Sequence, residues 1–567
     1  MAAEYLVELR GVVNSPYFQK HFGLDDQNHI NEVSSNVVSV LQAGAFFGSL
    51  GSAPVSGEFK SPRLWIPTSY LPVFVIDFTK SGRDRLYLYA HAQLCYFQPE
   101  LDGGVPSSYL PLFSSLARYV FRLKWFKFIT CPQILTTVAQ GSKGLAEIYS
   151  GRVISGIGIG AISAVSPAFV SECAPKDVRG RITGCFQIMV ALGVMISYFI
   201  NFGVGIHILS GARIWRIPFG LQLVPAGIMV LGLLTIKESP RWLASVDRRE
   251  EAITTLAYLR KDSVTSQAVV EEMYEIQAAI EEEREAREGL GWKEAFLGKG
   301  NFVRFVIAFV IFLLQQWAGQ NSVNYYAPQI FEAIGFTGLK NSLLASGIYG
   351  VVKFVATTLF IFFGVETLGR KLSLFISAIG MGTLFYIIGA LLKTHPPPSV
   401  IDGQLPPAPP PASRAMAGLL YIYVCFYSMG WGPLPWVYVS DIFPTRTRHY
   451  GLAVASASQW LWNFVVSKVT PQMVTNLGYK IFLMFATVNI GAMGLFALLI
   501  PETKGRSLEE MDIIFGAISA DQRQADIEKQ TRGETYLPIY VESFLTTLQA
   551  PPDTLKESLE HSVDEKV

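Results

Sequence analysis

The sequence predicts an all-α, polytopic membrane protein built from two related helical bundles, and three observations lead to this prediction. Half of the 567 residues are hydrophobic and only 16% are charged, whereas about 25% are charged in a typical soluble protein. Ten stretches are apolar over roughly the 20 residues that a helix needs to cross a bilayer. A pair of short motifs also recurs in the two halves of the chain.

The predicted spanning helices alternate with clusters of basic residues. Basic clusters lie at 176–181, 241–304, 370–371, 446–448 and 504–506. From residue 172 onward, two predicted helices separate each cluster from the next, so all clusters lie on one side of the membrane, which the positive-inside rule makes cytoplasmic. The ten predicted helices lie near 34–53, 150–171, 183–205, 217–236, 303–323, 343–364, 372–392, 415–437, 450–470 and 480–500.

This order divides the chain into two membrane bundles joined by a polar loop. The predicted parts are an N-terminal bundle (1–237), a cytoplasmic helical loop (238–301), a C-terminal bundle (302–500) and a cytoplasmic tail (501–567). The loop is dense in charge, as in EEMYEIQAAIEEEREAREGL, which is typical of helices lying on a membrane face. The polar tail after 517 is expected to be disordered.

An internal repeat relates the two bundles. SECAPKDVR (171–179) and SDIFPTRTR (440–448) share Ser, an acid, Pro and Arg at identical offsets. Two helices later, KESPR (237–241) and PETKG (501–505) again match in Glu and a hydroxyl. The repeat predicts two halves related by a pseudo-two-fold axis. It also predicts an incomplete N-terminal half, which has two clear helices before its motif where the C-terminal half has four.

Composition argues against several classes of function. The net charge of +1 gives no reason to expect a nucleic-acid partner, and the five cysteines have no metal-ligand spacing. No cluster of His, Asp and Ser and no metal cluster lies at membrane depth, so we expect no enzymatic activity, metal or cofactor. The partners we expect are the lipid bilayer and a small polar molecule, bound by a monomer.

The segment QQWAGQNSVNYYAP (315–328) places several amides at membrane depth. Amides are costly in hydrocarbon unless they meet polar partners. Because an amide both donates and accepts hydrogen bonds, it suits an uncharged, polyhydroxylated ligand. Gln315, Gln316 and Asn321 are predicted on nearby faces of a helix broken by Gly319. Hydrogen bonds between helices are the alternative use for these amides.

The motifs, taken in order, resemble the sugar porter family of the major facilitator superfamily. The similarity covers about 134–516 and 11–54, and some phrases resemble fungal hexose and quinate permeases. The resemblance implies a multi-pass protein, expected in the plasma membrane, that moves a monosaccharide by alternating access. Quinate or another polyol-like acid is the alternative substrate. The motifs that carry the resemblance are GRVISGIGIGA (151–161), PAFVSECAPKDVRGR (167–181), KESPRWL (237–243), QQWAGQNSVNYYAP (315–328), ETLGRK (366–371), GWGPLPWVYVSDIFP (430–444) and PETKGRSLEEMD (501–512).

The resemblance also implies which residues meet the substrate. An outer gate is expected from Tyr325 and Tyr326. Substrate amides and stacking rings are expected from Gln187, Gln315, Gln316, Asn321, Trp436 and Trp460, with Asn324, Gln459 and Asn463 as secondary candidates.

The charged residues of the motifs are expected to form a network on the cytoplasmic face. Such ions can pair across the two halves when the inner side closes and separate when it opens. The alternative is a set of solvated pairs that contribute about 0–1 kcal/mol each. The predicted network comprises Arg152, Glu172, Arg179, Glu238 and Arg241 in the N-terminal half, mirrored by Glu366, Arg370, Asp441, Arg448 and Glu502.

The N-terminal region departs from the family. Its first helix normally carries Gly-Tyr-Asp, whose Asp couples transport to protons in symporters, but ELRGVVNSPYFQ matches only the end of that helix. Residues 56–130 resemble nothing in the family. We expect a gene-model error here, with a shortened product as the alternative. Proton coupling therefore stays open, as do a non-transporting sugar sensor and an inactive product.

Lys353 bears on the charge of the substrate, because it is the basic candidate at membrane depth, away from the ends of the predicted helices. If Lys353 faces the cavity, a carboxylate substrate is favoured. If it extends to the membrane interface, a neutral sugar is favoured.

Overall fold

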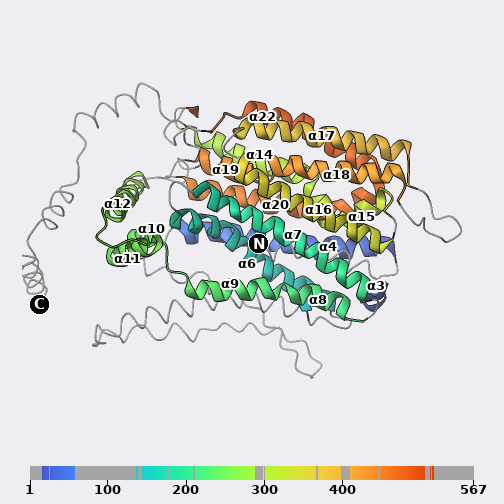
Figure 1. The fold of residues 1–567 in the computed structure, drawn as a ribbon, viewed down its shortest axis with the longest axis horizontal. Coiled ribbons are helices and arrows are strands. Elements are labelled where there is room, and N and C mark those ends of the chain that lie inside the picture. The colour runs from blue at the N-terminus through green and yellow to red at the C-terminus, as the bar shows by residue number, and fades with distance from the viewer. Residues whose placement is uncertain are drawn as a thin grey trace, which may run out of the picture.

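The computed structural model describes most of the membrane part of the chain (Figure 1). Within the described residues every regular element is a helix, in agreement with the predicted all-α class. The predictions for 1–15 and 58–130 lie outside these residues. The described residues are 16–23, 26–57, 136–137, 144–174, 179–208, 211–287, 296, 298, 300–336, 338–364, 368–397, 409–443, 447–504, 511 and 514–515.

The N-terminal half contributes long helices that run side by side in Figure 1. Helices α8 and α9 together make one crossing, interrupted at Gln222. The elements are α3 (Pro16–Phe22), α4 (Gln27–Gly57), α6 (Gly144–Cys173), α7 (Arg179–His207), α8 (Arg213–Leu221) and α9 (Leu223–Thr235).

The C-terminal half follows the same plan with more interruptions. The first crossing is broken between α14 and α15, and another is broken between α18 and α19. The elements are α14 (Asn301–Trp317), α15 (Gln320–Ala333), α16 (Leu339–Leu359), the π-helix η6 (Phe360–Gly364), α17 (Arg370–Thr394), α18 (Pro411–Met429), α19 (Leu434–Ile442), α20 (Arg448–Leu477), α21 (Lys480–Thr487), the π-helix η7 (Val488–Gly494) and α22 (Leu495–Leu499).

The polar loop between the halves forms three helices at one end of the bundle (Figure 1). These are α10 (Pro240–Ser245), α11 (Arg249–Arg260) and α12 (Gln267–Arg287). They bury a small core of their own around Leu243, Leu256 and Met273. The helical loop expected from the charged sequence is therefore present.

Each of the ten predicted spanning segments coincides with one described helix or with consecutive helices separated by a short break. Eight of the described helical stretches are long and apolar enough to cross a membrane. The two predicted segments outside these eight lie in α8–α9 and in α20. Helix α20 carries many polar side chains, and several of them, such as Ser456, Asn463 and Ser467, are buried against other helices.

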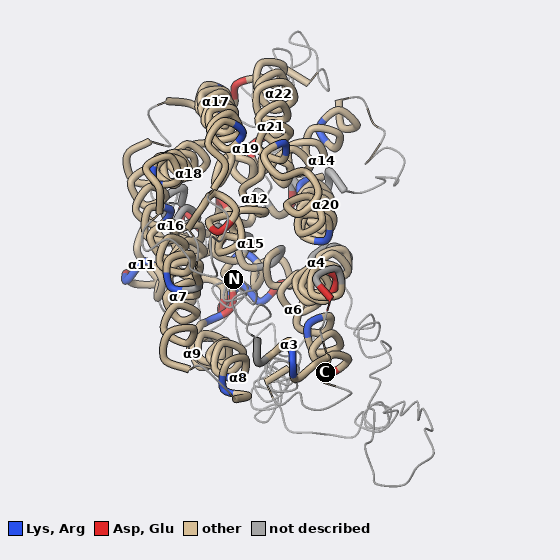
Figure 2. Tube along the Cα trace, turned by 90° about the vertical axis from the view of Figure 1, so that its right-hand side faces the viewer, with Lys and Arg blue, Asp and Glu red and all other residues tan. Residues whose placement is uncertain are grey.

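The two halves meet along two pairs of helices. Helix α4 packs on α20, and α7 packs on α16, which is visible end-on in Figure 2. Within the N-terminal half, α4 and α6 touch through glycines: a Cβ at Gly156 would lie 2.1 Å from the carbonyl oxygen of Leu41, and one at Gly48 would lie 2.1 Å from that of Ile157. The GIGIG sequence (156–160) thus serves close helix packing.

Candidate functional site

Two helix breaks shape the centre of the C-terminal half. Gly319, with φ of +92°, separates α14 from α15, and the phenyl rings of Phe385 and Phe485 leave no room for a side chain there. The carbonyl of Ala318 at this break accepts hydrogen bonds from the Tyr423 hydroxyl (3.0 Å) and from Asn489 Nδ2 (3.2 Å). The broken backbone is therefore satisfied inside the protein, as the hydrocarbon core requires.

A polar pocket lies beside these breaks and takes residues from both halves. Helices α6 and α7 contribute one wall, and α14, α15, α18, α19 and α20 contribute the other. Its volume is about 40 Å³, which is room for a few water molecules. A ring-sized substrate therefore needs the two halves to move apart. The lining residues are Ser163, Phe186, Gln187, Val190, Gln315, Gln316, Asn321, Tyr427, Gly432, Trp436, Gln459 and Trp460.

The amides of the first broken helix are linked to one another. Asn321 Nδ2 donates to Gln316 Oε1, and Gln316 Nε2 donates to Gln315 Oε1 at 3.4 Å. Gln315 Nε2 in turn donates to the carbonyls of Trp431 (2.6 Å) and Gly432 (3.2 Å) at the break before α19. These amides join helices, which is the alternative use that was predicted for them, and they also line the pocket. A substrate hydroxyl can bind these amides by replacing one of the weaker hydrogen bonds between them.

Two tryptophans frame the pocket. The ring of Trp436 stands edge-on to Phe312 at 4.6 Å. Trp460 Nε1 donates to Ser163 Oγ at 3.2 Å, across the interface between the halves. Beside it, Gln459 Oε1 is buried and has no hydrogen-bond donor among the described residues. An apolar ring face for stacking and a free acceptor thus lie together.

Seven of the nine predicted substrate residues line this pocket, and Asn324 and Asn463 do not. Asn324 binds Gln320 and Lys353, and Asn463 binds a gate tyrosine. Sequence reasoning missed the other five lining residues, which are Ser163, Phe186, Val190, Tyr427 and Gly432. Small, aliphatic and aromatic residues are common in membrane helices, so nothing in their own type or spacing set these five apart.

The two predicted gate tyrosines are buried and tied to α20. Tyr325, 5% exposed, accepts a hydrogen bond from Asn463 Nδ2 at 3.1 Å. Tyr326, fully buried, donates to the carbonyl of Ser467 at 2.5 Å. The backbone of Tyr326 leaves the helical region (φ −124°, ψ 24°). This part of α15 is therefore bent where it meets α20, one turn outside the pocket.

Lys353 lies inside the protein and does not extend to the membrane interface. It is 4% exposed, and its Nζ is 3.3 Å from Asn324 Oδ1. Asn324 Oδ1 also accepts from Gln320 Nε2 at 2.9 Å, and Gln320 Oε1 accepts from the Tyr349 hydroxyl at 2.9 Å. A buried cation is thus joined to the segment that carries the predicted gate.

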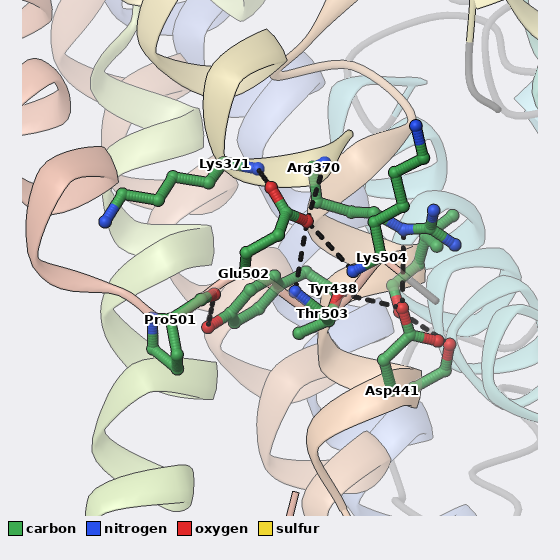
Figure 3. Close-up of polar contacts among 10 residues, drawn as sticks. Arg370, Lys371, Tyr438, Asp441, Pro501, Glu502, Thr503 and Lys504 are labelled. Atoms are coloured by element: carbon green, nitrogen blue, oxygen red, sulfur yellow. Dashed lines mark hydrogen bonds and ion pairs between the residues drawn. The ribbon is translucent and has the colours of Figure 1, made fainter. Parts of the chain in front are cut away.

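The C-terminal charged motifs meet at the start of α17 (Figure 3). Glu502 accepts hydrogen bonds from the backbone N–H groups of Arg370, Lys371 and Thr503 (each 3.0 Å) and Lys504 (2.9 Å). Burial raises the pKa of Glu502, but these four donors outweigh burial and hold it below its ordinary value. The carboxylate therefore caps the N-terminus of α17.

An ion pair lies beside this cap. Arg370 Nε is 3.5 Å from Asp441 Oδ2, which also accepts from Thr503 Oγ1 at 3.1 Å. Arg448 is close enough to Asp441 to interact with it electrostatically. These contacts join α17, α19 and α20 of the same half, whereas the sequence suggested pairing across the halves.

The N-terminal motif residues meet the helical loop. Glu172 Oε2 accepts from Ser239 Oγ at 2.6 Å, and Ser239 caps α10. Arg260 donates to both carboxylate oxygens of Glu272 (2.6 and 2.7 Å) and to the carbonyl of Cys173 (3.1 Å), and the hydrogen bonds with Glu272 raise the pKa of Arg260. The loop helices are thus bound to the end of α6.

Four other predicted network residues are placed less fully. Glu238 and Arg241 lie half-buried at the start of α10. The side chain of Arg179 and the whole of Glu366 lie outside the described residues.

The prediction that Arg152 belongs to the cytoplasmic network is wrong. Arg152 is in the third turn of α6, which begins at Gly144, whereas Glu172 is at the other end of the same helix. Twenty helical residues separate them, or about 30 Å, which is the thickness of the hydrocarbon core. Arg152 is 2% exposed and close enough to Tyr325 to interact with it electrostatically, so it lies near the predicted gate.

Two bundles of spanning helices around one shared polar pocket are the architecture of a secondary transporter. The protein family described as Sugar (and other) transporter matches residues 126–515. This chain belongs to that family, as its motifs indicated.

Curated relatives and solved structures agree with this assignment. The chain is 34% identical to the quinate permease of Emericella nidulans, over 88% of this chain and 83% of the relative. It is 38% identical to a probable quinate permease of Aspergillus terreus, over 86% of this chain and 78% of the relative. The fold matches the proton:xylose symporter XylE bound to 6-bromo-6-deoxy-D-glucose, with a TM-score of 0.65, 23% identity, and coverage of 91% of this chain and 96% of that structure.

Proposed function

We propose that this transporter carries a polyhydroxylated six-membered ring across the plasma membrane by alternating access, acting as a monomer. The observation that carries the proposal is the pocket itself: the linked amides and two tryptophans of the C-terminal half line it together with Gln187 and Ser163 of the N-terminal half. Amides match the hydroxyls of such a ring, and a tryptophan face matches its C–H face. A pocket built across a moving interface closes around its ligand from both sides.

The experiment is uptake by the purified chain in liposomes. Vesicles preloaded with an unlabelled compound are diluted into the same compound carrying a radiolabel, and exchange is followed for glucose, xylose and quinate. We expect saturable exchange of at least one of the three. Binding without exchange would instead support a sugar sensor, and neither binding nor exchange would support an inactive product.

A ring acid of the quinate type is a second candidate substrate, and we favour it over a neutral hexose. The curated relatives named above are quinate permeases. Lys353 is buried beside Asn324 and does not extend to the membrane interface, which was the arrangement expected for a neutral sugar. It does not line the pocket, which was the arrangement expected for a carboxylate substrate. In the exchange experiment this candidate requires quinate to compete with labelled substrate more strongly than glucose does.

We further propose that a proton gradient drives uptake. Solved structures with this fold include a D-xylose-proton symporter. The test imposes an inward proton gradient on the same liposomes. Accumulation of the substrate above its outside concentration, abolished by a protonophore, is the expected result, and equilibration alone would show facilitated diffusion.

A further inference from the structure

Gln42 is a buried amide on α4 whose carbonyl oxygen has no hydrogen-bond donor. It interrupts the apolar sequence VSVLQAGAFFGSL (38–50). Its side chain is 1% exposed, and Oε1 has no partner among the described residues. Leaving a buried acceptor unpaired lowers the stability of the fold, so such a group is best explained by a ligand that supplies the missing donor.

Two hydrogen bonds between α4 and α20 fix the level at which Gln42 meets the C-terminal half. Asn31 Nδ2 donates to Thr475 Oγ1 at 3.2 Å, and Lys468 Nζ donates to Asn36 Oδ1. Residue numbers rise along α4 as they fall along α20, so the two helices run antiparallel. Gln42 follows Asn31 by eleven residues, which is about three helical turns, so both lie on the same face of α4.

Two further unpaired acceptors lie at the same level of α20. Counting eleven residues back from Thr475 leads to Phe464, next to Asn463. Asn463 Oδ1 is buried without a donor among the described residues, and so is Gln459 Oε1, one turn further along the helix. Three amide oxygens that lack donors are therefore found at one level of the interface between α4 and α20.

The substrate pocket reaches this level as well. Trp460 lines the pocket and packs in one apolar cluster with Leu41 and Ala45, which lie on either side of Gln42 along α4. The pocket holds only about 40 Å³ and must widen to admit a ring. Gln42 thus stands at the edge of the space that a bound ring would fill.

Acceptors without donors favour ligand groups that can donate a hydrogen bond. A hydroxyl donates one hydrogen, whereas a carboxylate donates none. The unpaired oxygens of Gln42, Gln459 and Asn463 therefore favour the hydroxyl side of a ring and disfavour an acid group at this level. An acid group on the same ring would face away from α4.

We propose that Gln42 accepts a hydrogen bond from a ring hydroxyl of the substrate, which adds α4 to the substrate site and makes the transporter select highly hydroxylated rings. This inference rests on the proposed function, in which the other amides and the tryptophans hold the ring. A ring that lacks this hydroxyl leaves Oε1 of Gln42 unpaired, so it binds more weakly than the complete ring.

The test measures binding of quinate and glucose, and of analogues of each that lack one hydroxyl, to the full chain in lipid nanodiscs. We expect a missing hydroxyl to weaken binding to the unchanged protein roughly 5- to 100-fold. For one ring position alone, this deficit should disappear in Gln42→Met, which removes the acceptor and keeps the length of the side chain. Fluorine at that position should not restore binding, because fluorine cannot donate.

The matched control is Asn31→Leu, at the buried amide three turns away on the same face of α4. It should leave the ratio of affinities between each analogue and its parent ring unchanged. If Gln42→Met does not fold, Gln42→Asn takes its place, because it keeps the amide but draws it back by one methylene. It should reduce the same deficit.

The outcomes separate the inference from the proposed function. Equal deficits at every ring position in the Gln42 variant and the unchanged protein would overturn the inference while leaving ring transport in place. A fluorinated analogue that binds as well as the parent ring at the assigned position would do the same. If the unchanged protein binds neither quinate nor glucose, the proposed function fails and the inference fails with it.

Discussion

The hydroxyl of Tyr198, on α7, donates a hydrogen bond of 2.9 Å to the backbone carbonyl of Asn324, on α15. Both side chains are buried, at 1% and 4% exposure. The contact joins the N-terminal half to the gate segment of the C-terminal half. It exists only while these two helices are together, so it stabilises the state in which this side of the protein is closed.

Replacing Tyr198 with Phe should shift the protein toward opening on the gate side. One buried hydrogen bond contributes about 0.5–1.5 kcal/mol, so the ratio of open to closed molecules should rise by roughly 2- to 10-fold. Spin labels at Arg213→Cys and Lys480→Cys, both exposed positions, report the separation of the two halves in a background in which the five native cysteines are Ser. Tyr258→Phe, at an exposed ring on α11, is the control. Identical distance distributions in Tyr198→Phe and the parent would contradict the prediction.

Trp460 and Trp462 should differ sharply in their effect on transport, although they are two residues apart. Trp460 lines the pocket and bonds Ser163, whereas Trp462 packs edge-on against Phe309 and does not line it. Trp460→Ala should raise the KM for the ring substrate roughly 5- to 100-fold, because it removes a stacking face. Trp460→Phe should recover much of the loss. Trp462→Ala, the control, should leave KM nearly unchanged. A similar rise of KM in both Ala variants would contradict the assignment of Trp460 to the substrate pocket.

The pocket amides were predictable because their chemistry conflicts with their surroundings. Gln315, Gln316 and Asn321 interrupt an apolar helix, and only a polar partner reconciles them with membrane depth. The close packing at the glycines of α6 was predictable too, because small residues in a membrane helix let a neighbouring helix approach closely. What the sequence could not give is the direction of each side chain, so Asn324 and Asn463 could not be separated from the residues of the pocket wall.

The misplacement of Arg152 has a different cause. Arg152 stands in a motif next to other charged motifs, and charge in a membrane protein suggests a surface position. The spacing along the predicted helix was enough to avoid this error, since twenty helical residues place Arg152 a full hydrocarbon thickness away from Glu172. The contact partners of the other charges depend on tertiary packing, which places Asp441 beside Arg370 within one half.

Glu502→Gln should lower thermal stability in a pH-dependent way. The folded state depresses the pKa of Glu502 below its ordinary 4.5, so the charged form contributes stability above that pH and loses it as the pH falls through the folded value. The group is partly exposed and solvent screens it, so we expect a loss of about 1 kcal/mol or less at pH 7.

Thermal unfolding in detergent at pH 7 and below pH 4.5 measures this difference. The gap between the parent protein and Glu502→Gln should narrow at the lower pH. Glu250→Gln, at an exposed glutamate on α11, is the control and should leave the midpoint unchanged at both pH values. A gap that stays constant with pH would show that the charge of Glu502 does not matter.

Arg304→Met should release the segment that follows the last membrane helix. Arg304, on α14, is fully buried, its Nη2 donates to the carbonyl of Met511 at 3.1 Å, and its guanidinium lies 4.9 Å from the centre of the Phe515 ring. Methionine keeps the apolar stem but loses the charged hydrogen bond and the cation–π contact. Amide exchange in a peptide covering 511–515 should therefore accelerate roughly 10-fold or more. Arg414→Met, at an exposed arginine on α18, should leave that peptide unchanged, and equal exchange in both variants would show that Arg304 does not hold the segment.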